Sequence, residues 1–151
     1  MIELVRASPA HVGVIANRMR AADIEEAKAF GHSPKQALRL GIMGSSEAWT
    51  AKIDGRPEAM FGLVIVSALD GFARPWFLGT DAVYANGRAM LSTGRRITGR
   101  WLDSNRRLEN LVSASNLRAI RLLGRWGFTI EDDAMIVGGI PFHKFWAGAN
   151  V

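Results

Sequence analysis

The chain of 151 residues is 48% hydrophobic and 22% charged, and its formal net charge is +5. This length and composition suit a globular protein with one apolar core, so we expect residues 1–151 to form a single domain. The sequence has no cysteine, which excludes disulfides, cysteine-bound zinc and thiol nucleophiles and fits a reducing compartment such as the cytoplasm.

Neither secretion nor a membrane span is expected. The N-terminal sequence MIELVRASPAHVG has an early acid and no long apolar run, which is unlike a signal peptide. The longest mostly apolar run extends from Ala59 to Leu69, and its eleven residues are too few to cross a bilayer. Its β-branched content favours a buried strand.

The N-terminal part predicts a strand and two helices. Residues 2–7 (IELVRA) alternate as a short strand does. Residues 8–19 predict a helix capped by Ser8, with Pro9 in its first turn. Residues 33–43 (SPKQALRLGIM) predict a second helix, which opens with a capping box between its serine and glutamine. No element is predicted for residues 20–32.

The middle of the chain predicts three antiparallel strands and a helix. Residues 47–69 predict a β-hairpin that turns at Asp54-Gly55. Residues 74–83 (RPWFLGTDAV) predict the third strand. Residues 86–105 predict a helix with one apolar face and several arginines on the rest of its surface.

The C-terminal part predicts a crossover unit. Residues 108–115 (LENLVSAS) predict a strand, and residues 116–126 predict a helix that Gly127 ends. Residues 128–146 predict one or two final strands. The order β-α-α-β-β-β-α-β-α-β therefore predicts an α+β protein with a mixed sheet and helices on both faces.

Positive charge is concentrated in one segment. Residues 86–126 contain nine arginines and two acids, a balance of 9 − 2 = +7. The arginines are Arg88, Arg95, Arg96, Arg100, Arg106, Arg107, Arg118, Arg121 and Arg125. They form either a solvated helix surface or a site for a phosphate-bearing ligand, because the guanidinium fork pairs with phosphate oxygens. Lysines are few and no recognition motif is present, so nucleic-acid binding is not expected.

Two other motifs are discounted. Residues 94–101 (GRRITGRW) approach a P-loop, but Arg100 and Trp101 replace the lysine and the hydroxyl residue that it needs. The three histidines are far apart and lack the spacing of metal ligands, so no metal is expected.

The segment LENLVSASNLRAIRLLGRWGF contains a family pattern. Its Asn116, Ala119, Ile120, Gly127 and Phe128 resemble a strand and helix of the GCN5-related N-acetyltransferase (GNAT) superfamily, and the predicted element order agrees over nearly the whole chain. Within that superfamily, WFLGTDAV and NLVSASNLRAIRLLGRWGF are most similar to a phage family related to internal virion proteins of T7-type podoviruses. The resemblance implies a sheet that splays between two parallel strands, which we expect to separate after about Thr80 and Ser113.

The resemblance also implies a function and a site. A GNAT enzyme holds acetyl-CoA between the two parallel strands and transfers its acetyl group to an amine. The cofactor-binding residues implied here are Val83, Asn86, Gly87, Arg88, Asn116 and Arg121. Of these, Asn86 to Arg88 lie at a helix start suited to the pyrophosphate. Asp81 is the candidate general base, and Tyr84 can supply a proton to the departing thiolate.

Two departures leave an alternative open. The position of the family's helical tyrosine is Leu123, which cannot donate a proton, and the pyrophosphate loop keeps only one glycine, Gly87. The chain is therefore either an N-acyltransferase with an unknown amine acceptor or an inactive GNAT-like phage protein of virion assembly or ejection. The second alternative implies other virion proteins as partners and a location in the host cytoplasm or the virion. A homodimer is compatible with both.

Overall fold

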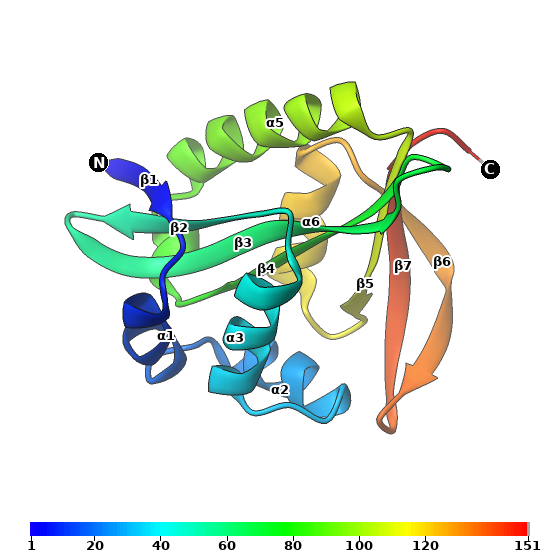
Figure 1. The fold of residues 1–151 in the computed structure, drawn as a ribbon. Helices are drawn as coiled ribbons and strands as arrows, with labels where there is room; N and C mark the ends of the chain where they lie inside the picture. Colours follow the sequence, from blue (N-terminus) through cyan, green and yellow to red (C-terminus); the bar gives the residue numbers. More distant parts are fainter. Residues whose placement is uncertain (151) are drawn as a thin grey trace.

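The computed structural model describes residues 1–150, and over that span seven strands form one mixed sheet (Figure 1). The strands lie in the order β1-β2-β3-β4-β5-β7-β6. Their bounds are β1 (Ile2–Arg6), β2 (Glu47–Ile53), β3 (Arg56–Ser67), β4 (Phe72–Gly79), β5 (Arg107–Ser113), β6 (Thr129–Val137) and β7 (Ile140–Gly148).

Helices cover both faces of the sheet. Figure 1 shows α1, α2 and α3 on one face and α5 and α6 on the other. The helix bounds are α1 (Pro9–Ala16), α2 (Ala21–Ala29), α3 (Pro34–Gly44), α4 (Ala82–Ala85), α5 (Gly87–Ser104) and α6 (Leu117–Arg125). The α+β class, the mixed sheet and the two helical layers predicted from the sequence are confirmed.

Helix α2 is an element that was not predicted from the sequence. Helices α1 and α3 start at the predicted caps, since Ser8 accepts the N–H of Ala10 and Ser33 forms its capping box. Helix α2 has no such start signal, and its buried residues are Asp23 and Ala27. The expectation that residues 20–32 form no helix or strand is therefore wrong. The helix gives no clear apolar spacing because its inward face is partly polar.

The third predicted strand, residues 74–83, is correct in only part of its length. Strand β4 ends at Gly79, and the next residue, Thr80, donates its N–H to the carbonyl of Glu58. Asp81 then adopts helical dihedrals (φ −64°, ψ −21°), and α4 follows. The strand predicted over residues 108–115 likewise ends at Ser113, and the last predicted segment forms the β6–β7 hairpin.

Strands β4 and β5 are parallel, as expected, but they separate earlier than predicted. They pair only at Phe72 with Arg107 and at Ala73 with Leu108. Beyond these pairs β4 remains bonded to β3, and β5 remains bonded to β7. The expected separation near Thr80 and Ser113 is therefore wrong by several residues, and most of the facing length of the two strands is unpaired.

Two apolar clusters hold the helices on the sheet. Val12, Ile15 and Leu38 pack with Met60 on the α1–α3 face. The next residue, Phe61, faces the opposite way and joins the larger cluster beneath α5 and α6. Among residues 1–150, no helix combines the length and the apolar character needed to cross a bilayer.

Candidate active site

The separation of β4 and β5 opens a slot through the middle of the sheet. The slot has a volume of about 820 Å³, and its walls come from both strands and from α2, α3, α4 and α6. At its narrow end the Asn110 side chain takes the place of backbone hydrogen bonds between β4 and β5. Its Nδ2 donates to the Pro75 carbonyl at 2.7 Å, and its Oδ1 accepts the Leu111 N–H at 2.7 Å. The narrow end is thus closed by a side chain.

Two carboxylates on α2 occupy the wide end of the slot. Asp23 accepts the N–H of Gly79, the last residue of β4, at 2.9 Å. Glu26 accepts the N–H of Ser113, the last residue of β5, at 3.1 Å. Residues three apart share one face of a helix, so α2 satisfies both strand ends with side chains one turn apart.

One backbone amide points into the slot between these two ends. Alternate residues of a strand direct their N–H and C=O groups to opposite sides. Gly79 and Pro75 both bond on the β5 side, whereas Thr80 bonds toward β3. Phe77 has the same parity as Gly79 and Pro75, so its N–H and C=O face the slot. There, no side chain of residues 1–150 hydrogen-bonds to either group.

Arg20 connects the two sides of the slot. Arg20 is 8% exposed, and its guanidinium donates from Nη1 to Asp23 at 3.0 Å and from Nη2 to the Asn116 Oδ1 at 3.2 Å. Asn116 in turn donates from Nδ2 to Glu26 at 2.8 Å. Although Asn116 precedes α6, its side chain does not cap that helix, because both amide groups serve this network.

Burial dominates the protonation of the two carboxyls. It raises the pKa of Glu26 to about 7, although the Asn116 amide and the Ser113 N–H favour the ionised form. Burial also raises the pKa of Asp23 to about 6, against the opposing effects of the Gly79 N–H and Arg20. Glu26 therefore exchanges its proton near neutral pH, which is the property required of a general base.

Tyr84 faces the slot from α4. The Arg20 guanidinium lies 4.2 Å above its ring, and the Arg118 guanidinium is 5.5 Å from the ring centroid. Its hydroxyl accepts from Arg20 Nη1 at 3.4 Å. Burial raises the pKa of Tyr84 to about 12, so the phenol keeps its proton at neutral pH.

The other predicted site residues lie outside this network or at its edge. Asp81 is 84% exposed and lies 3.8 Å from Arg20 Nε. Val83 is fully buried, so its side chain packs in the core. Asn86 donates its side-chain amide to the Ala82 carbonyl, and the residues that follow it, Gly87 and Arg88, are exposed at the start of α5. Arg121 is exposed on α6.

Tyr84 and Asn116 were predicted from the sequence as site residues, but the residues that join them were not. Arg20, Asp23 and Glu26 follow one another at intervals of three, which places them on one face of a helix. That spacing was the available signal, but it becomes informative only once α2 is known. Among residues 1–150, no group of three or more histidine, aspartate or glutamate side chains is arranged to hold a metal ion.

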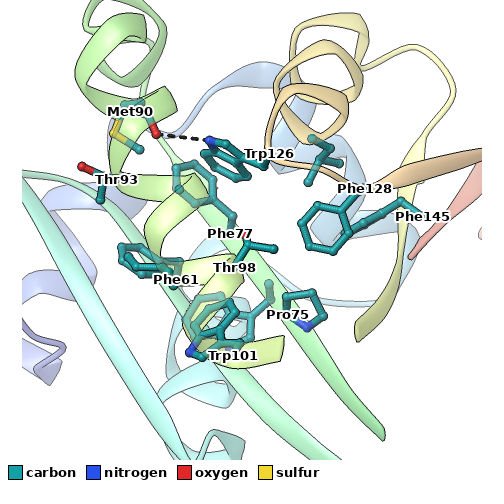
Figure 2. Close-up of a pocket in the computed structure, with 14 residues that line it drawn as sticks. Phe61, Pro75, Phe77, Met90, Thr93, Thr98, Trp101, Trp126, Phe128 and Phe145 are labelled. Carbon is teal, nitrogen blue, oxygen red and sulfur yellow. Dashed lines mark hydrogen bonds between the residues drawn. The ribbon is translucent and has the colours of Figure 1, made fainter. Parts of the chain in front are cut away.

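A smaller apolar pocket adjoins the slot beneath α5 and α6. Figure 2 shows the Trp126 indole reaching across to α5, where its Nε1 donates to the Met90 carbonyl at 3.2 Å. Phe77, Leu123 and Trp126 line both the slot and this pocket, whose volume is about 60 Å³. The α6 wall of the slot is therefore apolar at Leu123 and Trp126.

Solved acetyltransferase structures share this architecture. AAC(6')-Ib in complex with ribostamycin and coenzyme A has a TM-score of 0.69 and 14% identity, covering 97% of this chain and 93% of its own. The microcin C7 self-immunity acetyltransferase MccE, in complex with acetyl-CoA and AMP, has a TM-score of 0.70 and 12% identity. The match covers 98% of this chain and 92% of MccE. A GNAT-family acetyltransferase from Streptococcus pneumoniae has a TM-score of 0.60 and 12% identity, covering 97% and 98%.

The chain therefore has the GNAT fold, and the fold predicted from its sequence is confirmed. No protein-family model and no curated protein match the sequence. At 11–16% identity the structural likeness defines the fold, and the activity has to be argued from the chemistry of the slot.

Proposed function

We propose that the chain is an N-acetyltransferase that uses acetyl-CoA and an amine acceptor, and that it works as a single domain. The observation that carries this proposal is the slot between β4 and β5, which has the ionisable Glu26 at its wide end and the Phe77 amide along its wall. A group that accepts a proton near pH 7 and a fixed N–H donor are the two devices that acyl transfer to an amine needs.

The residues present fit acetyl-CoA. Asn86 directs its side chain back to Ala82 and leaves α5 without a side-chain cap, so the first-turn N–H groups remain available beside Arg88. A pyrophosphate suits this helix start, which follows Tyr84 on the slot wall by three residues. Gly87 and Arg88 would hold the diphosphate. Asn116 would adjoin the pantetheine arm through a network that already uses both of its amide groups.

The chemistry of the chain's own groups can be followed atom by atom. Acetyl-CoA supplies an acyl thioester, and the transfer forms a C–N bond as the C–S bond breaks. Glu26 takes a proton from the acceptor ammonium, which frees the nitrogen lone pair. The Phe77 N–H donates to the thioester oxygen as negative charge grows on it.

The proton for the departing sulfur is the remaining requirement. A thiol has a pKa of about 8.5, so transfer from Tyr84, whose pKa is about 12, would be uphill by roughly three pKa units. Transfer from protonated Glu26 is downhill. We therefore assign Tyr84 a hydrogen bond to the sulfur and let Glu26 or water deliver the proton. Asp81 remains a second candidate base, although it is exposed and outside the slot.

The experiment that tests this function has two parts. Acetyl-CoA at a hundredfold its Kd should stabilise the protein by roughly 2.7 kcal/mol, seen as a rise in melting temperature. An amine panel with thiol detection should then show free CoA released in an amine-dependent manner. Absence of both effects at millimolar acetyl-CoA would remove the proposal.

One observation supports the alternative. Leu123 and Trp126 make the α6 wall apolar, and a slot without a tyrosine there also suits a protein that keeps the fold without the reaction. In that case we propose a phage protein of virion assembly or ejection, which would be located in the host cytoplasm or the virion and bind other virion proteins. Failure of both parts of the acetyl-CoA experiment would favour this alternative.

A further inference from the structure

The outer part of the slot is unusually apolar for a solvent-facing surface. Phe30, Leu40, Val66 and Met135 line it and are 47%, 48%, 54% and 50% exposed. They come from four places in the fold: the end of α2, α3, β3 and β6. Single exposed apolar residues need no explanation, but four around one opening indicate a binding surface.

The slot has two zones that differ in charge: an inner zone around Asp23 and Glu26, and an outer zone that contains Arg74, Arg107, Glu109 and Lys144. In the inner zone Arg20 is paired with Asp23, so Glu26 is the carboxylate without a cation of its own. In the outer zone the buried Arg107 and the partly exposed Lys144 share Glu109. Arg74 is exposed there, and no carboxylate of residues 1–150 lies within 4.0 Å of its guanidinium. The outer balance is three cations against one acid, 3 − 1 = +2.

We propose that the acceptor is a primary monoamine attached to an apolar or aromatic body. Its ammonium would lie against Glu26, and its body would lie against Phe30, Leu40 and Met135. The positive outer zone disfavours a second ammonium, so a polycationic aminoglycoside should bind more weakly than a monoamine. This inference rests on the proposed function, and it names the acceptor for the same slot.

The reaction balances with these groups alone. The acceptor R–NH3⁺ and the acetyl thioester give R–NH–CO–CH3, free thiol and one proton released to solvent. The nitrogen loses two protons in all: one leaves the ammonium through Glu26 before the attack, and the second leaves after the C–N bond has formed. One of the two ends on the departing sulfur and the other is released to solvent. No oxidant, reductant or metal is consumed.

Binding of phenethylamine, measured by calorimetry at pH 8 without acetyl-CoA, tests the acceptor class apart from catalysis. At this pH Glu26 is ionised, since its pKa is about 7. Phenethylamine should bind at least tenfold more tightly than kanamycin. The neutral analogue ethylbenzene should bind at least tenfold more weakly than phenethylamine, because it lacks the ammonium.

Matched pairs of variants separate the apolar surface from general effects. Met135→Gln should weaken phenethylamine binding about fivefold, because roughly 1 kcal/mol of apolar contact is lost. Ile136→Gln is its control, since Ile136 is the next residue on β6, is 69% exposed and does not line the slot. Leu40→Gln should weaken binding similarly. Met43→Gln is its control on α3, since Met43 is 81% exposed and also lies outside the slot.

The outcomes distinguish this inference from the proposed function. Kanamycin binding as tightly as phenethylamine, or equal effects in the test and control variants, would overturn the inference even if acetyl-CoA binds and is turned over. Phenethylamine binding with the expected variant pattern would support the inference, and a lack of acetyl-CoA binding in the same preparation would then count against the proposed function alone.

Discussion

Asp23 and Glu26, one turn apart on α2, accept the terminal N–H groups of two different strands, Gly79 of β4 and Ser113 of β5. Separating two parallel strands leaves backbone donors without partners, and a buried unpaired donor is costly. Helix α2 removes that cost at the wide end of the slot. Burial in the same place raises the pKa of Glu26 to about 7, although its hydrogen bonds to Asn116 and to the Ser113 N–H oppose this rise. The helix that stabilises the opening therefore also carries the candidate base.

Packing of α5 against α6 depends on one glycine. A Cβ at Gly94 would overlap the Trp126 indole, which is also fixed by its bond to Met90. Gly94→Ala should therefore destabilise the fold by about 1–3 kcal/mol, measured by urea denaturation. In the same helix a Cβ at Gly99 meets nothing within 4 Å, so Gly99→Ala should be neutral or stabilising by about 0.5–1 kcal/mol. Equal destabilisation by both changes would refute the packing role of Trp126.

Arg20 holds the polar network together. Arg20→Gln would leave the Asp23 carboxyl buried without its cation and the Asn116 oxygen without a donor. We expect a loss of about 3–5 kcal/mol in the free energy of unfolding, as for other broken buried pairs. Arg39→Gln, at an exposed position on α3, is the control and should change stability by less than about 0.5 kcal/mol. A loss below 1 kcal/mol for Arg20→Gln would mean that the network contributes little.

Stability should fall as pH rises through the titration of Glu26. Its folded pKa of about 7 lies above the ordinary value of 4.5, so the folded state binds more protons than the unfolded state between these pH values. Wild-type protein should therefore lose about 1–3 kcal/mol relative to Glu26→Gln between pH 5 and pH 8. Asp23 acts in the same direction, and His11, whose burial lowers its pKa, acts in the opposite one. The difference in stability between the two proteins isolates Glu26. If the free energy of unfolding of wild type and of Glu26→Gln changed equally with pH across this range, the prediction would be contradicted.

The start of α5 should bind the diphosphate of acetyl-CoA. Arg88→Gln removes an exposed cation beside the uncapped first turn and should raise the Kd for acetyl-CoA about tenfold, the equivalent of one charge-assisted hydrogen bond. Arg6→Gln, on β1 and also exposed, should leave the Kd unchanged. Titration calorimetry gives both Kd values. Equal Kd values for the two variants would contradict binding of the diphosphate at the start of α5.

Local signals explain which parts of the fold were predictable. Ser8, the Ser33–Gln36 pair and the Asp54-Gly55 turn act within a few residues of themselves, and the elements that they start or join are present. Helix α2 lacks a cap, and it buries Asp23, so neither its start nor its apolar spacing stands out. Its existence depends on contacts with β4 and β5, which no short window of sequence contains.

The same distinction applies to the site: some of its residues could be predicted from local sequence, and the others could not. Asn116 stands out through its helix motif, and Tyr84 is the single tyrosine of the chain. Their partner Arg20 lies 96 positions from Asn116, and Asp23 lies 56 positions from Gly79, so only the folded chain brings them together. The end of β4 at Gly79 is a similar case, because the bond between Thr80 and Glu58 joins residues 22 positions apart.

The pH dependence of acetyl transfer in Glu26→Gln tests the central claim most directly. In wild-type protein, kcat/KM for the best acceptor should rise with pH through a limb near pH 7, where Glu26 loses its proton. Glu26→Gln should lower kcat/KM roughly 10²–10⁴-fold and abolish that limb, and the exposed neighbour variant Glu25→Gln should keep both rate and limb. A Glu26→Gln enzyme that retains the wild-type rate and the limb near pH 7 would contradict the account.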